Sequence, residues 1–283
     1  FTTRLAAAVD RVDSGPYGHL RFSREEMREL RYASLLHDFG KVGVREQVLV
    51  KAKKLYPPDL SLIRGRHAFI RRSAEATYHK ARADYLDAHG RDGLDAFLAQ
   101  LDARYKEELD GVEHFLKTVL QSNEPTVLPE GSFEDLVTYR QRQFPDIDGV
   151  PQPWLSDDEV RFLTIRKGSL DEAERHEIES HVTHTYRFLL QIPWTKELAQ
   201  IPLIAYGHHE KLNGTGYPRN AAAPAIPLQT RMMTIADIFD ALTAADRPYK
   251  RAVPLARAID IMYEEVKAQN LDQDLFRLFV EGK

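Results

Sequence analysis

The residues best suited to do chemistry in this chain are histidines and aspartates that border apolar segments. His37 and Asp38 directly follow the largely apolar run 33–36, and His208 and His209 continue the buried side of a predicted helix. A carboxylate or imidazole that is removed from water needs a hydrogen-bond partner or a metal ion to compensate it. Each of these residues alone is more often an ordinary paired side chain, but two adjacent buried imidazoles need hydrogen-bond acceptors, donors or a cation beside them.

Two further predicted helices carry the remaining candidates. His181 lies on the apolar face of its helix, and His184, three residues later, is its rival. Asp237 has apolar neighbours, so it is either a metal ligand or a buried acceptor, whereas Asp240 can face Arg247. The chain has no cysteine, so any metal must be bound through nitrogen and oxygen. Such ligands suit iron, manganese, magnesium or zinc inside a helix bundle.

The elements that must position these residues are helical. Apolar residues recur at helical spacing along most of the chain, and Ser23 and Ser169 each begin a capping-box pattern. The sequence shows no convincing strand-like alternation, so the predicted fold class is all-α. The predicted helices cover residues 23–36, 169–189, 198–208, 232–242, 254–267 and 273–280.

The middle of the chain has a different composition. Residues 60–120 are rich in charged residues and alanine, with aromatic and aliphatic residues spaced through them. This pattern predicts two long helices in an antiparallel hairpin that turns near residues 90–93, and residues 144–153 are predicted as a loop. The preferred interpretation is a solvated helical insertion, and a surface for dimerisation or signal input is the alternative.

Composition narrows the classes of partner. The chain has 283 residues, of which 43% are hydrophobic and 29% charged, and its formal net charge is −4. Without a basic field, duplex nucleic acid is not an expected partner. No apolar run approaches the roughly 20 residues that a membrane helix needs. Because the chain begins at Phe1 rather than at methionine, we expect a longer protein with a sensory domain before this point.

Three runs of sequence carry a family resemblance. They are LLHDFGKVGV at 35–44, HHEKLNGTGYP at 208–218 and IADIFDALTAADRPYK at 235–250. With these runs the chain resembles the HD-GYP family, a group of bacterial metal-dependent phosphodiesterases that act on cyclic di-GMP. The resemblance implies an HD-type helical bundle as the catalytic domain, built from residues 1–54 and 160–283 and interrupted by the helical insertion 55–159.

The resemblance also implies a metal centre and a substrate site. It implies two divalent metal ions, iron or manganese, with Asp38 as the bridge, and a third ion stays open because its ligands would precede Phe1. The implied metal ligands are His37, Asp38, His181, His208, His209 and Asp237. The implied catalytic residues are Asp38 and Lys41, and the implied substrate-binding residues are Lys41, Tyr217, Arg247 and Lys250.

The activity that the resemblance implies is hydrolysis of cyclic di-GMP to pGpG, with a second cleavage to GMP left open. A hydroxide activated between the two metals would attack phosphorus, and no organic cofactor is expected. Two alternatives remain: 3′3′-cGAMP as the substrate, or a cyclic-dinucleotide receptor or signalling scaffold with little turnover. A homodimer through the insertion is a further option. The expected location is the cytoplasm, with a membrane tether elsewhere in a longer protein also allowed.

Overall fold

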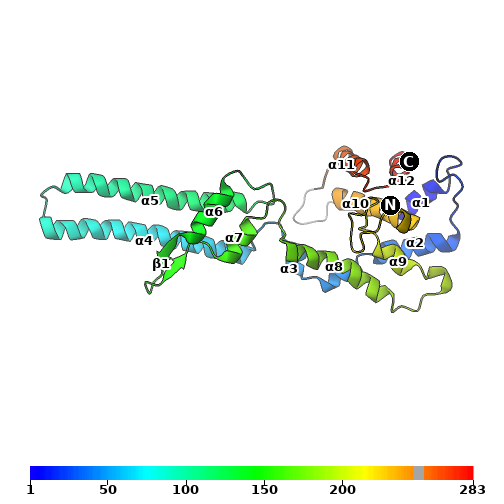
Figure 1. Ribbon diagram of the computed structural model, residues 1–283, viewed down its shortest axis with the longest axis horizontal. Coiled ribbons are helices and arrows are strands. Elements are labelled where there is room, and N and C mark those ends of the chain that lie inside the picture. Colours follow the sequence, from blue (N-terminus) through cyan, green and yellow to red (C-terminus); the bar gives the residue numbers. More distant parts are fainter. Residues whose placement is uncertain (245–251, 283) are drawn as a thin grey trace. The chain divides into compact units, whose positions relative to one another are not determined.

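The computed structural model describes residues 1–244 and 252–282, and twelve α-helices account for most of them (Figure 1). This confirms the predicted all-α class. The chain divides into two compact units, which we call the discontinuous unit (residues 1–50 and 173–283) and the middle unit (residues 51–172). In the described ranges, no helix combines the length and the apolar character needed to cross a bilayer.

The discontinuous unit contains most of the helices and every described residue of the predicted metal centre. Its N-terminal segment and its C-terminal segment contribute the following elements: α1 (Thr2–Val9), α2 (Arg24–Leu36), the 3₁₀-helix η1 (Phe39–Gly43), α3 (Glu46–Leu49), α8 (Glu172–Leu189), the 3₁₀-helix η2 (Lys196–Leu198), α9 (Ile201–Tyr206), the 3₁₀-helix η3 (Ala223–Ala225), α10 (Leu228–Thr243), α11 (Leu255–Lys267) and α12 (Gln273–Glu281).

One hydrophobic core holds this unit together. Leu5 of α1, Leu30 and Ala33 of α2, Met232 of α10 and Phe276 of α12 are all buried in it. The start of α2 is fixed by the predicted capping box, because the Ser23 hydroxyl accepts from the Glu26 amide while the Glu26 carboxylate accepts from the Ser23 amide. The apolar face of α2 therefore brings its C-terminal end, where His37 follows, against the core.

Helix α9 is shorter than the sequence predicts. It ends at Tyr206 rather than near His208, and Gly207 is its C-cap residue. Glycine is a poor helix former, so the helix ends before the histidine pair. His208 and His209 therefore lie in the turn that follows α9, where the Thr234 hydroxyl on α10 donates a 2.9 Å hydrogen bond to the carbonyl oxygen of His208.

The middle unit consists of a long helical hairpin and several shorter helices and strands. It contains α4 (Pro57–His89), α5 (Leu94–Ser122), α6 (Ser132–Gln141), β1 (Gln143–Pro145), β2 (Pro151–Pro153) and α7 (Asp157–Leu163). Helices α4 and α5 turn at residues 90–93 as predicted, with positive φ at Gly90 and Gly93. The predicted loop 144–153 instead contains the antiparallel pair β1–β2. Strands of three residues are too short to show an alternating pattern.

The base of the hairpin carries the core of the middle unit. Ile63 and Ile70 of α4 pack with Phe115 and Val119 of α5 and with Trp154. The sequence predicts domain boundaries at 54/55 and 159/160, and these stay a prediction. The compact units of the structure divide at 50/51 and 172/173.

Candidate metal centre

The junction between α2 and η1 presents the His–Asp pair. His37 is the C-cap residue of α2 and Asp38 is the N-cap residue of η1. The backbone of Asp38 has φ −98° and ψ 4°, in the sparsely populated bridge region that active-site residues often occupy. The change from α-helix to 3₁₀-helix at this point turns both side chains toward the other candidates.

Three of the predicted ligand histidines are oriented by the same local contact. The Nδ1 atoms of His37, His181 and His208 each lie within hydrogen-bonding distance of the backbone carbonyl three residues earlier, at 2.8, 2.5 and 2.7 Å. A carbonyl oxygen can only accept, so Nδ1 carries a proton in each ring, and in the neutral imidazole Nε2 keeps its lone pair. This is the arrangement of metal-binding histidines, whose second ring nitrogen donates to a protein acceptor.

Asp38 lies between these imidazoles. Its Oδ1 is 3.3 Å from His181 Nε2 and 3.9 Å from His208 Nε2. Its Oδ2 is 3.5 Å from His37 Nε2 and accepts a 2.5 Å hydrogen bond from Lys41. Burial works to raise the pKa of Asp38, but His181, His37 and the Lys41 ammonium outweigh burial and hold that pKa well below its usual range. The carboxylate is therefore ionised, with its two oxygens facing different histidines.

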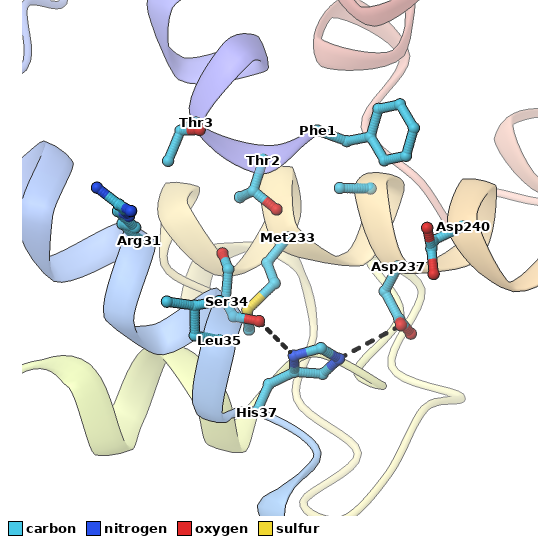
Figure 2. A pocket seen from close by; sticks show the side chains of 11 residues that line it. Phe1, Thr2, Thr3, Arg31, Ser34, Leu35, His37, Met233, Asp237 and Asp240 are labelled. Atoms are coloured by element: carbon cyan, nitrogen blue, oxygen red, sulfur yellow. Dashed lines mark hydrogen bonds and ion pairs between the residues drawn. The ribbon is translucent and has the colours of Figure 1, made fainter. Parts of the chain in front are cut away.

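Asp237 approaches the same group from α10. Its Oδ1 lies 3.4 Å from His37 Nε2, and Figure 2 shows this contact together with the bond from His37 to the Ser34 carbonyl. Burial acts to raise the pKa of Asp237, yet the hydrogen bond and charge of His37 give a net lowering. For His37, burial acts to lower its pKa, and the hydrogen bond to Asp237 and the charge of Asp38 reverse that effect and raise it.

The histidine pair after α9 is held neutral. Burial, with the nearby charges of His209 and His37, keeps the pKa of His208 well below its ordinary value. Burial also lowers the pKa of His209 to about 4, although the charge of Asp237 opposes it. Neutral imidazoles are the protonation state that binds a metal ion. The ring of His209 lies with its centroid 5.3 Å from that of His181.

The donor set fits a metal centre. Candidate ligand atoms form two groups, each within 4.8 Å, and the groups share His208. The first group is His181, His208 and His209, and the second is His37, His208 and Asp237. Asp38 Oδ1, His181 Nε2 and His208 Nε2 are buried without a hydrogen-bond partner among the described residues. Orphaned polar atoms of this kind are costly unless a cation compensates them.

The other predicted site residues have different positions. His184, the rival of His181, is exposed on α8 and lies beside Gly43. Tyr217 stands with its ring centroid 4.8 Å from that of His209. Arg247 and Lys250 lie outside the described residues.

A cavity of about 360 Å³ opens beside this centre (Figure 2). His37 and Asp237 form one wall, and Asp240, Arg31 and Phe1 are among the other residues that line it. The cavity offers a cationic group, a carboxylate and an aromatic ring next to the proposed metal ligands.

Glu210 is a residue beside the centre that sequence reasoning quoted in its motif but gave no role. It is buried, and its carboxylate accepts the backbone N–H groups of Arg219 and Ala221, both at 2.8 Å. These bonds hold the loop that contains Tyr217. The only available sequence signal was an acidic residue directly after two buried histidines, which does not reveal its backbone partners.

Comparison with known proteins adds to this geometry. Residues 158–275 match the model of the HD domain. The chain is similar to 3′3′-cGAMP-specific phosphodiesterase 3 of Vibrio cholerae, at 46% identity over 101 residues, which are 36% of this chain and 21% of the relative. It is also similar to the cyclic di-GMP phosphodiesterase response regulator RpfG of Xanthomonas campestris, at 37% identity over 103 residues, 36% of this chain and 27% of the relative.

A third relative is a cyclic di-GMP phosphodiesterase of Pseudomonas aeruginosa, at 34% identity over 133 residues, 47% of this chain and 29% of the relative. The chain thus spans less than a third of the length of these relatives. The fold, the His/Asp centre and these matches agree on one class: residues 158–275 match an HD domain, in agreement with the HD-GYP resemblance. Within that family, the relatives named above are phosphodiesterases of cyclic dinucleotides.

Proposed function

We propose that this chain hydrolyses cyclic di-GMP to linear pGpG with two divalent metal ions, iron or manganese. The observation that carries the proposal is the convergence around Asp38 of histidine Nε2 atoms that their Nδ1 bonds leave as free acceptors. The six proposed ligands are His37, Asp38, His181, His208, His209 and Asp237. The relatives, which act on cyclic dinucleotides by name, support the substrate class.

The chain's own residues then have distinct roles. When bound, the metals supply Lewis acidity and lower the pKa of water, which provides a nucleophile at neutral pH. Asp38 would help to hold both ions, as the resemblance implies, and His208 belongs to both candidate ligand groups. Lys41 holds Asp38 in its ionised form. Its proposed second role is to neutralise the charge that develops on the phosphate. Tyr217 contacts the substrate beside His209, and Arg247 and Lys250 bind phosphate or guanine.

The cavity beside His37 and Asp237 is the proposed entrance for one nucleotide of the substrate. Its volume is about 360 Å³. The Arg31 guanidinium can pair with a phosphate, and the Asp240 carboxylate can accept the N–H groups of a guanine edge. Substrate bound in this way places a phosphate next to the proposed metal ligands.

A second candidate substrate is 3′3′-cGAMP. The 46% identity to a 3′3′-cGAMP-specific phosphodiesterase favours it as the runner-up. The two substrates differ in one base, so base contacts in the cavity would decide between them.

The test is a comparative turnover assay with the purified chain and both dinucleotides, in the presence of Mn²⁺ or Fe²⁺. We expect faster loss of cyclic di-GMP, with pGpG as the first product, and no turnover by Asp38→Ala. Equal or faster loss of 3′3′-cGAMP would overturn the substrate assignment. Binding of either dinucleotide without hydrolysis by the metal-loaded protein would instead identify a receptor.

The remaining features of the proposal concern the chain's organisation. We propose that residues 1–54 and 160–283 are the catalytic domain and that residues 55–159 are an insertion, which the division into two compact units supports. We also propose that the protein acts in the cytoplasm, that a sensory domain precedes this chain, and that the insertion can form a homodimer. Elemental analysis of protein purified without added metal tests the choice of iron or manganese and whether a third ion binds.

A further inference from the structure

A buried threonine joins the His–Asp junction to the helix that carries His181. Thr185 lies on α8, one turn after His181, and is fully buried. Its hydroxyl donates a 2.9 Å hydrogen bond to the carbonyl oxygen of His37 and accepts a 2.8 Å hydrogen bond from the Gly40 amide. One hydroxyl thus satisfies a backbone acceptor just before Asp38 and a backbone donor just after it.

The two backbones approach each other so closely here that there is no room for a side chain at Gly40. A Cβ atom added to Gly40 would lie 2.0 Å from the His181 carbonyl oxygen and 2.5 Å from the Thr185 amide nitrogen. The end of α2 and the start of η1 leave backbone groups without partners in their own helices. At this buried contact, the Thr185 hydroxyl is the partner of two of them, the His37 carbonyl and the Gly40 amide.

We propose that Thr185 is a positioning residue of the metal centre, an inference that rests on the proposed function. Its hydroxyl holds the main chain on both sides of Asp38, and its helix carries His181, whose Nε2 lies 3.3 Å from Asp38 Oδ1. Thr185 therefore fixes the position of the Asp38 carboxylate, at the α2–η1 junction, relative to His181 on α8. Without the hydroxyl, the junction shifts to find other partners and Asp38 moves relative to His181.

The test compares Thr185→Val, which keeps the shape and removes the hydroxyl, with Thr185→Ser, which keeps the hydroxyl. The first readout is Mn²⁺ affinity, measured by titration of the metal-free protein. The second is hydrogen exchange of the Gly40 amide in the metal-free protein, measured by NMR. Thr118→Val is the matched control, because Thr118 is also buried inside a helix but belongs to α5 of the middle unit.

We expect Thr185→Val to weaken Mn²⁺ binding by about 10–100-fold, the usual effect of losing a contact that orients a ligand. The same variant should lose protection of the Gly40 amide. Thr185→Ser should retain both properties, and Thr118→Val should leave both unchanged. If Thr185→Val does not fold, Thr185→Ala replaces it in the same two measurements.

Unchanged Mn²⁺ affinity in a hydroxyl-free variant would overturn the proposal, even if the melting temperature fell, because the role would then be structural only. Equal weakening by Thr185→Ser would overturn it as well. The outcome for the proposed function is separate. Should the wild-type chain hydrolyse no cyclic dinucleotide while the affinity pattern holds, the proposed function fails and the role of Thr185 stands.

Discussion

At the scale of single residues, the centre depends on which carboxylates face histidines. Asp237 and Asp240 lie three residues apart on α10 and line the same cavity, but only Asp237 belongs to a candidate ligand group. Asp237 Oδ1 lies 3.4 Å from His37 Nε2, whereas Asp240 is exposed. The two aspartates are therefore a natural pair for separating metal binding from cavity effects.

We predict that Asp237→Ala loses at least one of the two metal ions per chain and that Asp240→Ala keeps both. The reason is that alanine at 237 removes an anionic oxygen that compensates the cation, while alanine at 240 removes only an exposed carboxylate. Metal content of the purified variants, measured by elemental analysis, checks this. Equal metal loss in both variants would contradict the proposed ligand set.

A second residue-scale prediction concerns a buried lysine in the middle unit. Lys54 is fully buried, its ammonium donates to the Leu163 carbonyl at 3.3 Å, and burial lowers its pKa below the ordinary value. Between the folded-state pKa and about 10.4, the unfolded chain binds more protons, so the contribution of Lys54 to stability rises with pH in that window. Below the folded-state pKa the full cost of the buried charge is present.

We therefore expect Lys54→Met to stabilise the protein at neutral pH by roughly 1–3 kcal/mol, because methionine needs no compensation when buried. This advantage should shrink as the pH rises toward the lysine's unfolded-state pKa. Urea unfolding at several pH values measures it. Lys53→Met is the control, since the exposed Lys53 pairs with Glu124 at the surface and should change stability by less than about 1 kcal/mol. An advantage of Lys54→Met that did not vary with pH would contradict the argument.

Sequence reasoning could nominate the site residues but not their orientation. Apolar context and motif spacing singled out the four histidines and two aspartates, and the structure brings them into one cluster; their role as ligands stays a prediction. The Nδ1 bonds and the hydroxyl of Thr185 were not predictable, because a threonine on a helix face has many ordinary roles and its partner is 148 positions away.

At the scale of elements, most long helices followed from apolar periodicity, as for α2, α8 and α10. The predicted capping box at Ser23 is present, whereas α8 begins at Glu172 and the Ser169 hydroxyl donates to the Lys51 carbonyl instead.

Short elements did not follow from apolar periodicity. The strands β1 and β2 have three residues each, and their turn depends on the Asp146 carboxylate, which accepts the amides of Asp148 and Val150. The early end of α9 was also not predicted, because it depends on a single residue, the C-cap Gly207.

The loop after His209 supports a prediction at this scale. A Cβ atom at Gly216 would lie 2.4 Å from the Lys211 amide nitrogen and 2.5 Å from the His209 carbonyl oxygen. Gly216→Ala should therefore displace the loop, destabilise the protein by about 1–3 kcal/mol and weaken metal binding through His209. Chemical denaturation and Mn²⁺ titration measure the two effects.

Gly65→Ala provides the contrast, because Gly65 lies inside α4 and an added Cβ there meets nothing within 4 Å. It should stabilise the protein by about 0.5–1 kcal/mol and leave Mn²⁺ affinity unchanged. If Gly216→Ala kept wild-type stability and metal affinity, the tight loop would have no part in shaping the centre.

At the scale of the whole molecule, the sequence separated a charged helical stretch from the segments that carry the motifs. The compact units follow the same division, with the described candidate ligands all in the discontinuous unit. The sequence could not predict how close Lys51 and Ser169 lie to each other in space. The Ser169 hydroxyl donates a 2.9 Å hydrogen bond to the Lys51 carbonyl, a contact between residues 118 positions apart.

This contact makes the middle unit removable in principle. We predict that a variant in which a short Gly–Ser linker replaces residues 52–168, joining Lys51 to Ser169, still folds and binds two metal ions per chain. The six proposed ligands and the backbone carbonyls that orient His37, His181 and His208 all lie outside the deleted segment. Circular dichroism and elemental analysis of the purified variant check the prediction. A soluble, helical deletion variant that binds no metal would show that the middle unit completes the centre.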